Sequence, residues 1–299
     1  MNRGMLYAVG AYVAWGFLPI YWKALHSLPA LEILAHRVAW GALVAIVLVT
    51  YRLRWDWLGA VLGNRRTLLT FVASALLLSF NWFVYIWAVN AGYVIETSLG
   101  YFINPLINVL LGVLFLRERL RGGQALAIAI AAGGVLYLTF QYGALPWSAL
   151  ALASSFGLYG LLRKTASIGS LEGFTLETLL LFVPAVGYLI FREAQGGAAF
   201  GHAGAGIELL LVGAGVMTAI PLLLFGAGAR RLTLTSLGIL QYIAPTLQFL
   251  LGVLVYGESL TPQRLIGFVL IWLALAVYTA EGIWTSGGTA RVRVAAAKS

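Results

Sequence analysis

Two stretches of this chain, TSLGYFINPLINVLLGVLFLRERL (97–120) and TSLGILQYIAPTLQFLLGVLVYGESL (235–260), are near copies of each other. From Pro105 and Pro245 onward, eight of 16 positions match at one constant offset, the one that separates these two prolines. The matches are Pro105/Pro245, Leu110/Leu250, Leu111/Leu251, Gly112/Gly252, Val113/Val253, Leu114/Leu254, Glu118/Glu258 and Leu120/Leu260. Because Pro, Gly and Glu recur at corresponding places, the similarity indicates an internal repeat rather than the shared composition of two apolar helices.

The composition indicates that this chain is solvated mainly by lipid. Of its 299 residues, 61% are hydrophobic and 10% are charged, and the mean hydropathy is +0.92. A soluble globular protein carries about 25% charged residues, so most of this surface must face a bilayer. The chain has no Cys, which excludes disulfides and Cys-based metal or redox sites. The net charge of +9 comes from short basic clusters, which favour cytoplasmic loops near anionic lipid over a nucleic-acid partner.

Ten apolar segments are long enough to be predicted as membrane spans. Helices are predicted because lipid cannot satisfy backbone polar groups and the runs lack the alternation of barrel strands. The first segment contains Trp15, Pro19 and Lys23 without a small-residue cleavage site, so it is predicted to be a retained span rather than a signal peptide. The predicted spans are 4–24, 30–50, 68–90, 94–116, 123–141, 146–163, 173–191, 207–229, 234–256 and 263–283.

The basic residues predict the orientation of these spans. With both termini in the cytoplasm, 15 of the 19 basic residues lie on the inside, and three, Lys23, Arg192 and Arg264, lie on the outside. Arg37 falls within the second span. The inside group is Arg3, Arg52, Arg54, Arg65, Arg66, Arg117, Arg119, Arg121, Arg163, Lys164, Arg230, Arg231, Arg291, Arg293 and Lys298.

The repeat divides the chain into two halves. Residues 1–142 and 143–284 are predicted as two five-helix repeats, followed by a cytoplasmic basic tail, 285–299. Since five is odd, the second repeat must cross the membrane in the opposite sense to the first. The fold class is therefore an all-α polytopic membrane protein of ten transmembrane helices in two inverted repeats. Such repeats are typical of carriers that work by alternating access.

Several segments also resemble a known family. WGFLPIYWKAL (15–25), LEILAHRVAW (31–40) and the segment 80–120 are similar to the RarD group of the EamA family, in the drug/metabolite transporter superfamily. The usual EamA repeat ending is present at 257–260, whereas Arg117 replaces its glycine in the first repeat. The resemblance covers nearly the whole chain. It implies ten helices with both termini inside, in a bacterial inner membrane, and export of small metabolites, amino acids or drugs.

Polar side chains within the spans are the candidates for a substrate site, because such groups should face the protein interior or a cavity. Asn81 and Tyr85 share one helix face at a spacing of four. An alternative for the amides is a hydrogen bond to a neighbouring helix, worth about 0.6 kcal/mol. Pro105 and Pro245 each remove a backbone donor and are the predicted hinges. The predicted substrate-binding residues are Asn81, Tyr101, Asn104, Gln241, Trp15, Tyr12, Trp82, Tyr85, Ser155, Tyr159 and Tyr242.

Two charged positions in the second span are candidates for proton or charge coupling. His36 can titrate near neutral pH. Three roles are open for Arg37: an ion pair with Glu32, snorkelling to the interface, or binding a substrate carboxylate. Glu177 occupies the repeat position of Arg37 and is predicted near the inner end of its span. No Asp or Glu is predicted deep within a span, which weakens a proton-antiport mechanism.

These residues predict a secondary transporter rather than an enzyme. The chain has three His, one Asp and no HExxH motif, so no catalytic set and no metal or cofactor is expected. Aromatic walls with amides and hydroxyls suit amino acids, including aromatic ones. Neutral aromatic drugs such as chloramphenicol are the alternative, and a passive channel is a third possibility. The expected partners are a small molecule and the bilayer, and the sequence leaves monomer and dimer open.

Overall fold

The computed structural model describes residues 3–53, 55–90, 94–143, 145–257 and 262–296. The expectations for Arg54, for Glu258 and for the last residues of the tail lie outside this part, as do those for the side chains of Arg264, Arg291 and Arg293. The described helices are α1 (Arg3–Lys23), α2 (Ala30–Arg52), α3 (Asp56–Leu62), α4 (Arg65–Asn90), α5 (Val94–Leu116), α6 (Gly122–Tyr142), α7 (Trp147–Thr165), α8 (Ser170–Ala194), α9 (Ala205–Ala229), α10 (Leu234–Gln241), α11 (Ile243–Leu254) and α12 (Pro262–Ala296).

The helix boundaries lie within a few residues of the predicted spans, with three differences. The short helix α3 forms in a segment that was expected to be a loop. The segment 234–256 forms two helices, α10 and α11, which meet at Tyr242. Helix α12 continues to Ala296, beyond the predicted end of its span at 283.

Nine helical segments of the described chain are long and apolar enough to cross a membrane. Helix α7, which corresponds to the predicted span 146–163, is not among the nine. Its serines and its last-turn Arg163 and Lys164 lower the hydropathy, but Ser148 and Arg163 are buried against other helices. Within the described ranges the secondary structure is all-helical, and the chain is a multi-pass membrane protein.

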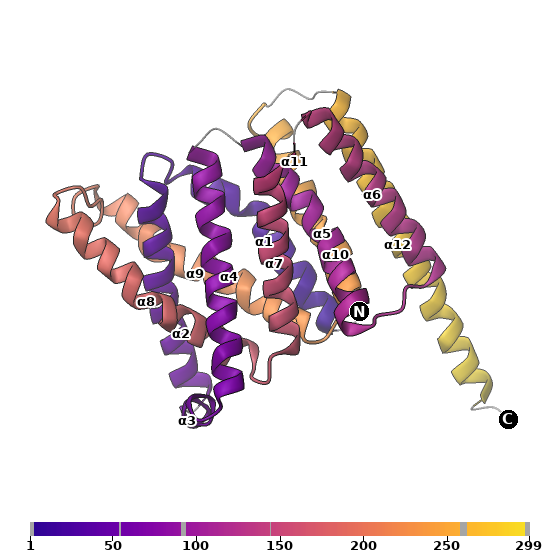
Figure 1. Cartoon of the computed structure of the whole chain (residues 1–299), viewed down its shortest axis with the longest axis horizontal. Helices are drawn as coiled ribbons and strands as arrows, with labels where there is room; N and C mark the ends of the chain where they lie inside the picture. Colours follow the sequence, from indigo (N-terminus) through magenta and orange to yellow (C-terminus); the bar gives the residue numbers. More distant parts are fainter. Residues whose placement is uncertain (1–2, 54, 91–93, 144, 258–261, 297–299) are drawn as a thin grey trace.

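The two halves of the chain place their helices at equal intervals. Helices α2, α4, α5 and α6 begin at residues 30, 65, 94 and 122, and helices α8, α9, α10 and α12 begin at 170, 205, 234 and 262. In all four cases the offset is the one that separates Pro105 from Pro245. Three of these equivalent pairs pack directly on each other: α2 with α8, α5 with α10, and α6 with α12. Figure 1 shows α6 and α12 side by side along one flank of the bundle.

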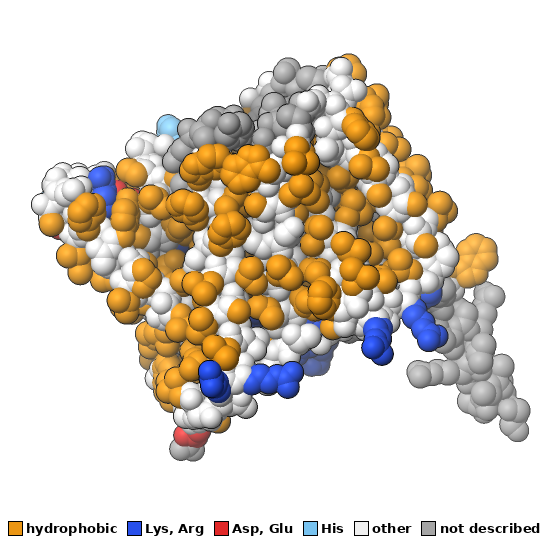
Figure 2. Space-filling view, in the orientation of Figure 1, with side chains coloured by type: hydrophobic (Ala, Val, Ile, Leu, Met, Phe, Trp, Pro, Cys, Tyr) orange, Lys and Arg blue, Asp and Glu red, His pale blue; other side chains and the backbone are white. Residues whose placement is uncertain are grey.

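The surface has an apolar face and a basic edge. Figure 2 shows hydrophobic side chains over most of one face of the bundle, with Lys and Arg side chains along its lower edge. The basic edge consists of exposed side chains at the helix ends that the charge pattern assigns to one side, namely Arg52, Arg65, Arg66, Arg117, Arg119, Arg121, Arg230 and Arg231. A belt of apolar surface beside a basic rim is the arrangement that a bilayer stabilises.

The half of the bundle next to the basic edge is closed by side-chain packing. Tyr12, Tyr159 and Phe225 are at most 1% exposed and pack together in one hydrophobic cluster. The carboxylate of Glu118, just after α5, accepts hydrogen bonds from the backbone N–H groups of Leu234 at 2.7 Å and Thr235 at 3.0 Å. An acidic group at the free N–H groups of a helix start is stabilising, so Glu118 ties the segment after α5 to the beginning of α10.

Candidate functional site

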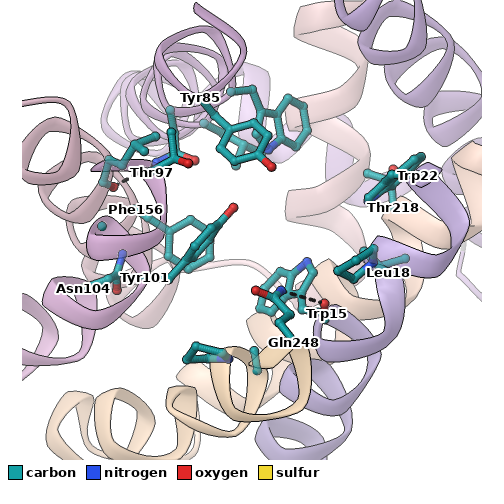
Figure 3. Close-up of a pocket in the computed structure, with 18 of the residues that line it drawn as sticks. Trp15, Leu18, Trp22, Tyr85, Thr97, Tyr101, Asn104, Phe156, Thr218 and Gln248 are labelled. Carbon is teal, nitrogen blue, oxygen red and sulfur yellow. Dashed lines mark hydrogen bonds between the residues drawn. The ribbon is translucent and has the colours of Figure 1, made fainter. Parts of the chain in front are cut away.

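A central cavity of about 440 Å³ lies in the half of the bundle away from the basic edge. It is formed by the second half of α1, the first half of α2, the later part of α4 and the first half of α5, with further residues from α7, α9, α10 and α11. In Figure 3, Tyr85 and Tyr101 border one side of the open space, and Trp22, Thr218 and Leu18 border the other. The volume falls in the range of about 300–1,000 Å³ that is typical of small-molecule sites.

Most of the residues that the sequence singled out lie at this cavity. Eight of the eleven predicted substrate-binding residues line it, and so do Arg37 and the predicted hinge Pro245. The eight are Tyr12, Trp15, Asn81, Trp82, Tyr85, Tyr101, Asn104 and Gln241. Pro105 is buried within the continuous helix α5, whereas Pro245 lies three residues after the junction of α10 and α11.

Ser155, Tyr159 and Tyr242 are not among the residues that line the cavity, and they make contacts between helices instead. Ser155 accepts a hydrogen bond from Asn81 Nδ2 at 2.9 Å. The Tyr159 hydroxyl lies 3.4 Å from Glu177 Oε2, and the Tyr242 hydroxyl donates to the carbonyl of Phe102 at 3.2 Å. All three side chains are at most 4% exposed. Their hydroxyl groups form hydrogen bonds to neighbouring helices inside the protein. This is the alternative to substrate binding that applies to polar residues in membrane helices.

Two amides at the cavity, Asn81 and Gln248, are held through their nitrogen end only. Asn81 Nδ2 donates to the carbonyl of Leu152 and to Ser155, both at 2.9 Å, and Gln248 Nε2 donates to the carbonyl of Trp15 at 3.2 Å. The bond from Gln248 is the dashed line to Trp15 in Figure 3. Among the described residues neither amide oxygen has a hydrogen-bond donor, so both remain as acceptors at the cavity lining.

A connected set of three amide side chains, Asn104, Asn108 and Gln241, lies where α5 meets α10. Asn108 Nδ2 donates to Asn104 Oδ1 at 3.0 Å and to Gln241 Oε1 at 2.9 Å. Asn104 Nδ2 in turn donates to the carbonyl of Ala153 at 3.2 Å. This network fixes the orientation of Asn104 and Gln241 at the cavity and joins two helices that hold equivalent places in the two halves of the chain.

Arg37 does not form the ion pair with Glu32 that was one of its open roles. Glu32 is buried, accepts a hydrogen bond from the backbone N–H of Ala199, and lies 3.5 Å from Arg192. At a spacing of five, Glu32 and Arg37 point to different sides of α2, because residues that share a helix face are three, four or seven apart. Arg37 Nε donates to Thr218 Oγ1 at 3.1 Å instead, and its guanidinium lies between the rings of Trp22 and Trp82.

His36 faces a different cavity. This second cavity, of about 510 Å³, lies between α2 and α8 and is lined mainly by apolar side chains together with His202 and Glu193. The His36 ring is 4% exposed and packs against Phe200, with 5.3 Å between ring centroids. Neither ring nitrogen has a hydrogen-bond partner among the described residues. His36 is therefore absent from the lining of the central cavity.

A buried charge cluster, formed by Arg163 and Glu177, lies next to Tyr159 in the closed half of the bundle. Glu177 lies in the first part of α8 (Ser170–Ala194), near the end of its span where it was expected, and it is only 1% exposed. Its carboxylate lies 3.6 Å from Arg163 Nη1 and accepts hydrogen bonds from Ser74 and Tyr159. The cluster joins α4, α7 and α8 on the closed side of the bundle.

The cavity also contains residues that the sequence argument did not select. Trp22 and Thr218 both line the cavity and contact Arg37. The signal for Trp22 was present, because it shares one face of α1 with Trp15 and Leu18 at spacings of seven and four. Thr218 is the one hydroxyl-bearing residue of the apolar helix α9, which is a weaker signal. Within the described ranges, no three His, Cys, Asp or Glu residues lie close enough to hold a metal ion.

The fold and the cavity define a class: a multi-pass helical membrane protein with a small-molecule-sized cavity enclosed between its helices. Comparison with known proteins identifies the family within this class. The family model described as "EamA-like transporter family" matches residues 2–140. The chain is 48% identical to the "Uncharacterized transporter YojE" of Bacillus subtilis, over 93% of this chain and 94% of that protein. It is 46% identical to the "Protein RarD" of Streptomyces exfoliatus, over 95% of this chain and 90% of that protein.

These similarities place the chain, as a RarD-like member, in the EamA-like transporter family. A solved structure described as "Crystal structure of protein" has the same fold, with a TM-score of 0.71 at 23% identity, over 93% of this chain and 98% of that one.

Proposed function

We propose that this protein exports small amphipathic metabolites, most of all amino acids including aromatic ones, across the bacterial inner membrane by alternating access. The observation that carries the proposal is the central cavity of about 440 Å³, enclosed between helices of a chain from a transporter family. Its lining combines tryptophan and tyrosine rings with the amides of Asn81 and Gln248, whose oxygens have no hydrogen-bond donor among the described residues. An aromatic amino acid has both the apolar ring and the polar groups that such a lining can bind.

The proposed mechanism needs ten spans in two inverted repeats, 1–142 and 143–284, followed by the basic tail 285–299. The constant interval between equivalent helix starts supports the repeat. The direct packing of α2 on α8, α5 on α10 and α6 on α12 also supports it, because equivalent elements meet along a two-fold axis. The hydrogen bond from Tyr242 to the carbonyl of Phe102 joins two equivalent positions of this kind.

The basic edge is proposed to face the cytoplasm, which places both chain termini inside. The cavity then lies in the outer half of the membrane, and the packed layer around Tyr12, Tyr159 and Phe225 closes the inner half. In this state the cavity is on the side to which an exporter releases its substrate. Transport requires the opposite state, in which the contact between Glu118 and the start of α10 separates, with Pro105 and Pro245 as candidate hinges.

The test is counterflow in liposomes that contain the purified protein. Unlabelled phenylalanine, tryptophan, threonine or methionine is loaded inside, and entry of the same labelled amino acid is followed with and without a pH gradient. We expect saturable counterflow that falls in Asn81→Ala and Gln241→Ala, with exposed Gln195→Ala as the matched control. Flux that does not saturate and shows no counterflow would indicate a passive channel and contradict the proposal.

A neutral aromatic drug such as chloramphenicol remains the second candidate substrate, because three tryptophans, Trp15, Trp22 and Trp82, line the cavity. Counterflow of labelled chloramphenicol in the same liposomes, without competition by any amino acid, would favour this candidate. The pH gradient addresses coupling separately: a requirement for it would bring His36 and Glu177 forward as the groups to replace.

A further inference from the structure

We propose that Arg37 binds the carboxylate of the transported molecule, so that the central cavity selects substrates that carry a carboxylate. The inference rests on the proposed function and deepens it by naming the chemical group that the cavity recognises. It also separates amino acids from neutral drugs, which the aromatic lining alone does not.

Arg37 brings an uncompensated positive charge to the cavity. Among the residues described as lining the cavity it is the single charged side chain, and no Asp or Glu is among them. Within the described ranges, no acidic oxygen lies within salt-bridge distance of its guanidinium. A charged group inside a membrane protein is costly unless it is paired or lines a functional path.

Two described acidic side chains, Glu32 and Glu177, are engaged with partners other than Arg37. Glu32, on the same helix, lies 3.5 Å from Arg192 and accepts a hydrogen bond from Ala199. Glu177, at the repeat position of Arg37, lies 3.6 Å from Arg163. The two halves of the chain therefore differ at equivalent positions: one has a paired acid, and the other has a base without a partner in the described protein. A bound anion would supply the missing charge.

The Arg37 guanidinium is held in place through Nε, which leaves its two Nη atoms as further hydrogen-bond donors. Its Nε donates to Thr218 Oγ1 at 3.1 Å, and the two Nη atoms have no hydrogen-bond acceptor among the described residues. The ring centroids of Trp22 and Trp82 lie 4.6 Å and 4.8 Å from its central carbon, which orients the guanidinium plane by cation–π contact. Arginine binds carboxylates through two parallel N–H···O bonds, so a fixed plane with free Nη atoms suits this group. Thr218 and Trp22 lie on the same side of the open space in Figure 3.

The rest of the lining complements a zwitterion. The free amide oxygens of Asn81 and Gln248 are acceptors that an ammonium group can donate to. The rings of Trp15 and Phe156 provide apolar surface between the polar groups. An α-amino acid would place its carboxylate at Arg37, its ammonium at the amide oxygens and its side chain against the rings.

The experiment compares a carboxylate with its neutral isostere. Phenylalanine counterflow is measured for the wild type, Arg37→Gln, Arg37→Lys and the control Arg231→Gln, with 3-phenylpropionate or 3-phenylpropionamide as competitor. Arg231 is exposed at the basic edge, remote from the cavity lining. We expect 3-phenylpropionate to compete roughly 10- to 100-fold better than the amide in the wild type. In Arg37→Gln the KM for phenylalanine should rise by a similar factor and the preference for the carboxylate should disappear.

Arg37→Lys keeps the charge and should retain part of the preference for the carboxylate. This variant can be measured even if Arg37→Gln does not fold. A purely structural role for Arg37 would lower transport without changing the preference, so an unchanged preference in both variants would overturn the inference. Equal competition by the two probes in the wild type would overturn it as well.

Failure of the proposed function can be distinguished from failure of the carboxylate site. If the wild type carries no amino acid, that proposal fails, and the inference is tested by thermal unfolding of the purified protein with the same two probes. Stabilisation by 3-phenylpropionate but not by the amide, lost in Arg37→Gln, would support a carboxylate site. An equal response to both probes, or none, would reject it.

Discussion

The buried ion pair between Arg163 and Glu177 should make single and double substitutions behave very differently. Arg163 Nη1 and Glu177 Oε1 are 3.6 Å apart, and the two side chains are 2% and 1% exposed. At an effective dielectric constant of about 20, two unit charges at this distance attract by about 4–5 kcal/mol. Glu177→Leu leaves the guanidinium charged and buried without its partner. We therefore expect this variant to lower the free energy of unfolding by about 3–5 kcal/mol.

The double variant Arg163→Met/Glu177→Leu should recover most of that loss, because replacing a buried pair by apolar side chains is often neutral or stabilising. Thermal and denaturant unfolding of the purified protein in one detergent measures all variants. Glu193→Leu is the matched control, since its carboxylate pairs with His202 at the surface, where such pairs are worth at most about 1 kcal/mol. A double variant as unstable as Glu177→Leu, or a single variant as stable as the wild type, would refute this reasoning.

Three further predictions concern a close helix contact at Gly215, the left-handed backbone of Arg117 and the orientation of the chain in the membrane. A side-chain carbon on Gly215 would lie 2.4 Å from a backbone carbon of α2, so Gly215→Ala should destabilise the protein by about 1–3 kcal/mol in thermal unfolding; Gly187→Ala, in open space, should be neutral or stabilising. Arg117 has a left-handed backbone with φ 54°, so Arg117→Gly should raise the free energy of unfolding by about 1 kcal/mol, and a lower value would contradict this. Because the chain has no Cys, a membrane-impermeant thiol reagent added outside cells should label His202→Cys but not Arg66→Cys; the reverse pattern would invert the proposed orientation.

The sequence predicts the helices well because their ends carry local signals. Helix α2 follows Pro29, α6 ends before Gly143 in the left-handed region, and α12 begins at Pro262. The repeat adds a second constraint, since a boundary found in one half predicts the equivalent boundary in the other. Arg117 and Gly257, which are separated by the same offset as Pro105 and Pro245, both have a left-handed backbone although the residue types differ.

The site is harder to predict, because which face of a helix meets a cavity depends on its neighbours. Asn81 and Tyr159 both looked like cavity residues in single helices, but Tyr159 is covered by Phe225, whose ring centroid lies 5.9 Å away on α9. The partners of Glu32 and Arg37 come from segments far from α2 in sequence: Arg192 and Ala199 engage Glu32, and Thr218 accepts from Arg37. Helical spacing separates Glu32 from Arg37 but does not identify the partners that each acquires.

The packing of each half on the other has a consequence for how the chain is made. Helices α1, α2 and α5 have extensive contacts with α9, α8 and α7, and α6 packs chiefly on α12, which is made long after it. The face of α6 around Gly134, which lies close to Leu270 of α12, therefore lacks this partner until α12 has been made. A nascent chain that stops after residue 142 has inserted its helices but lacks most of their partners. Residues 1–142 therefore depend on helices made later for much of their packing.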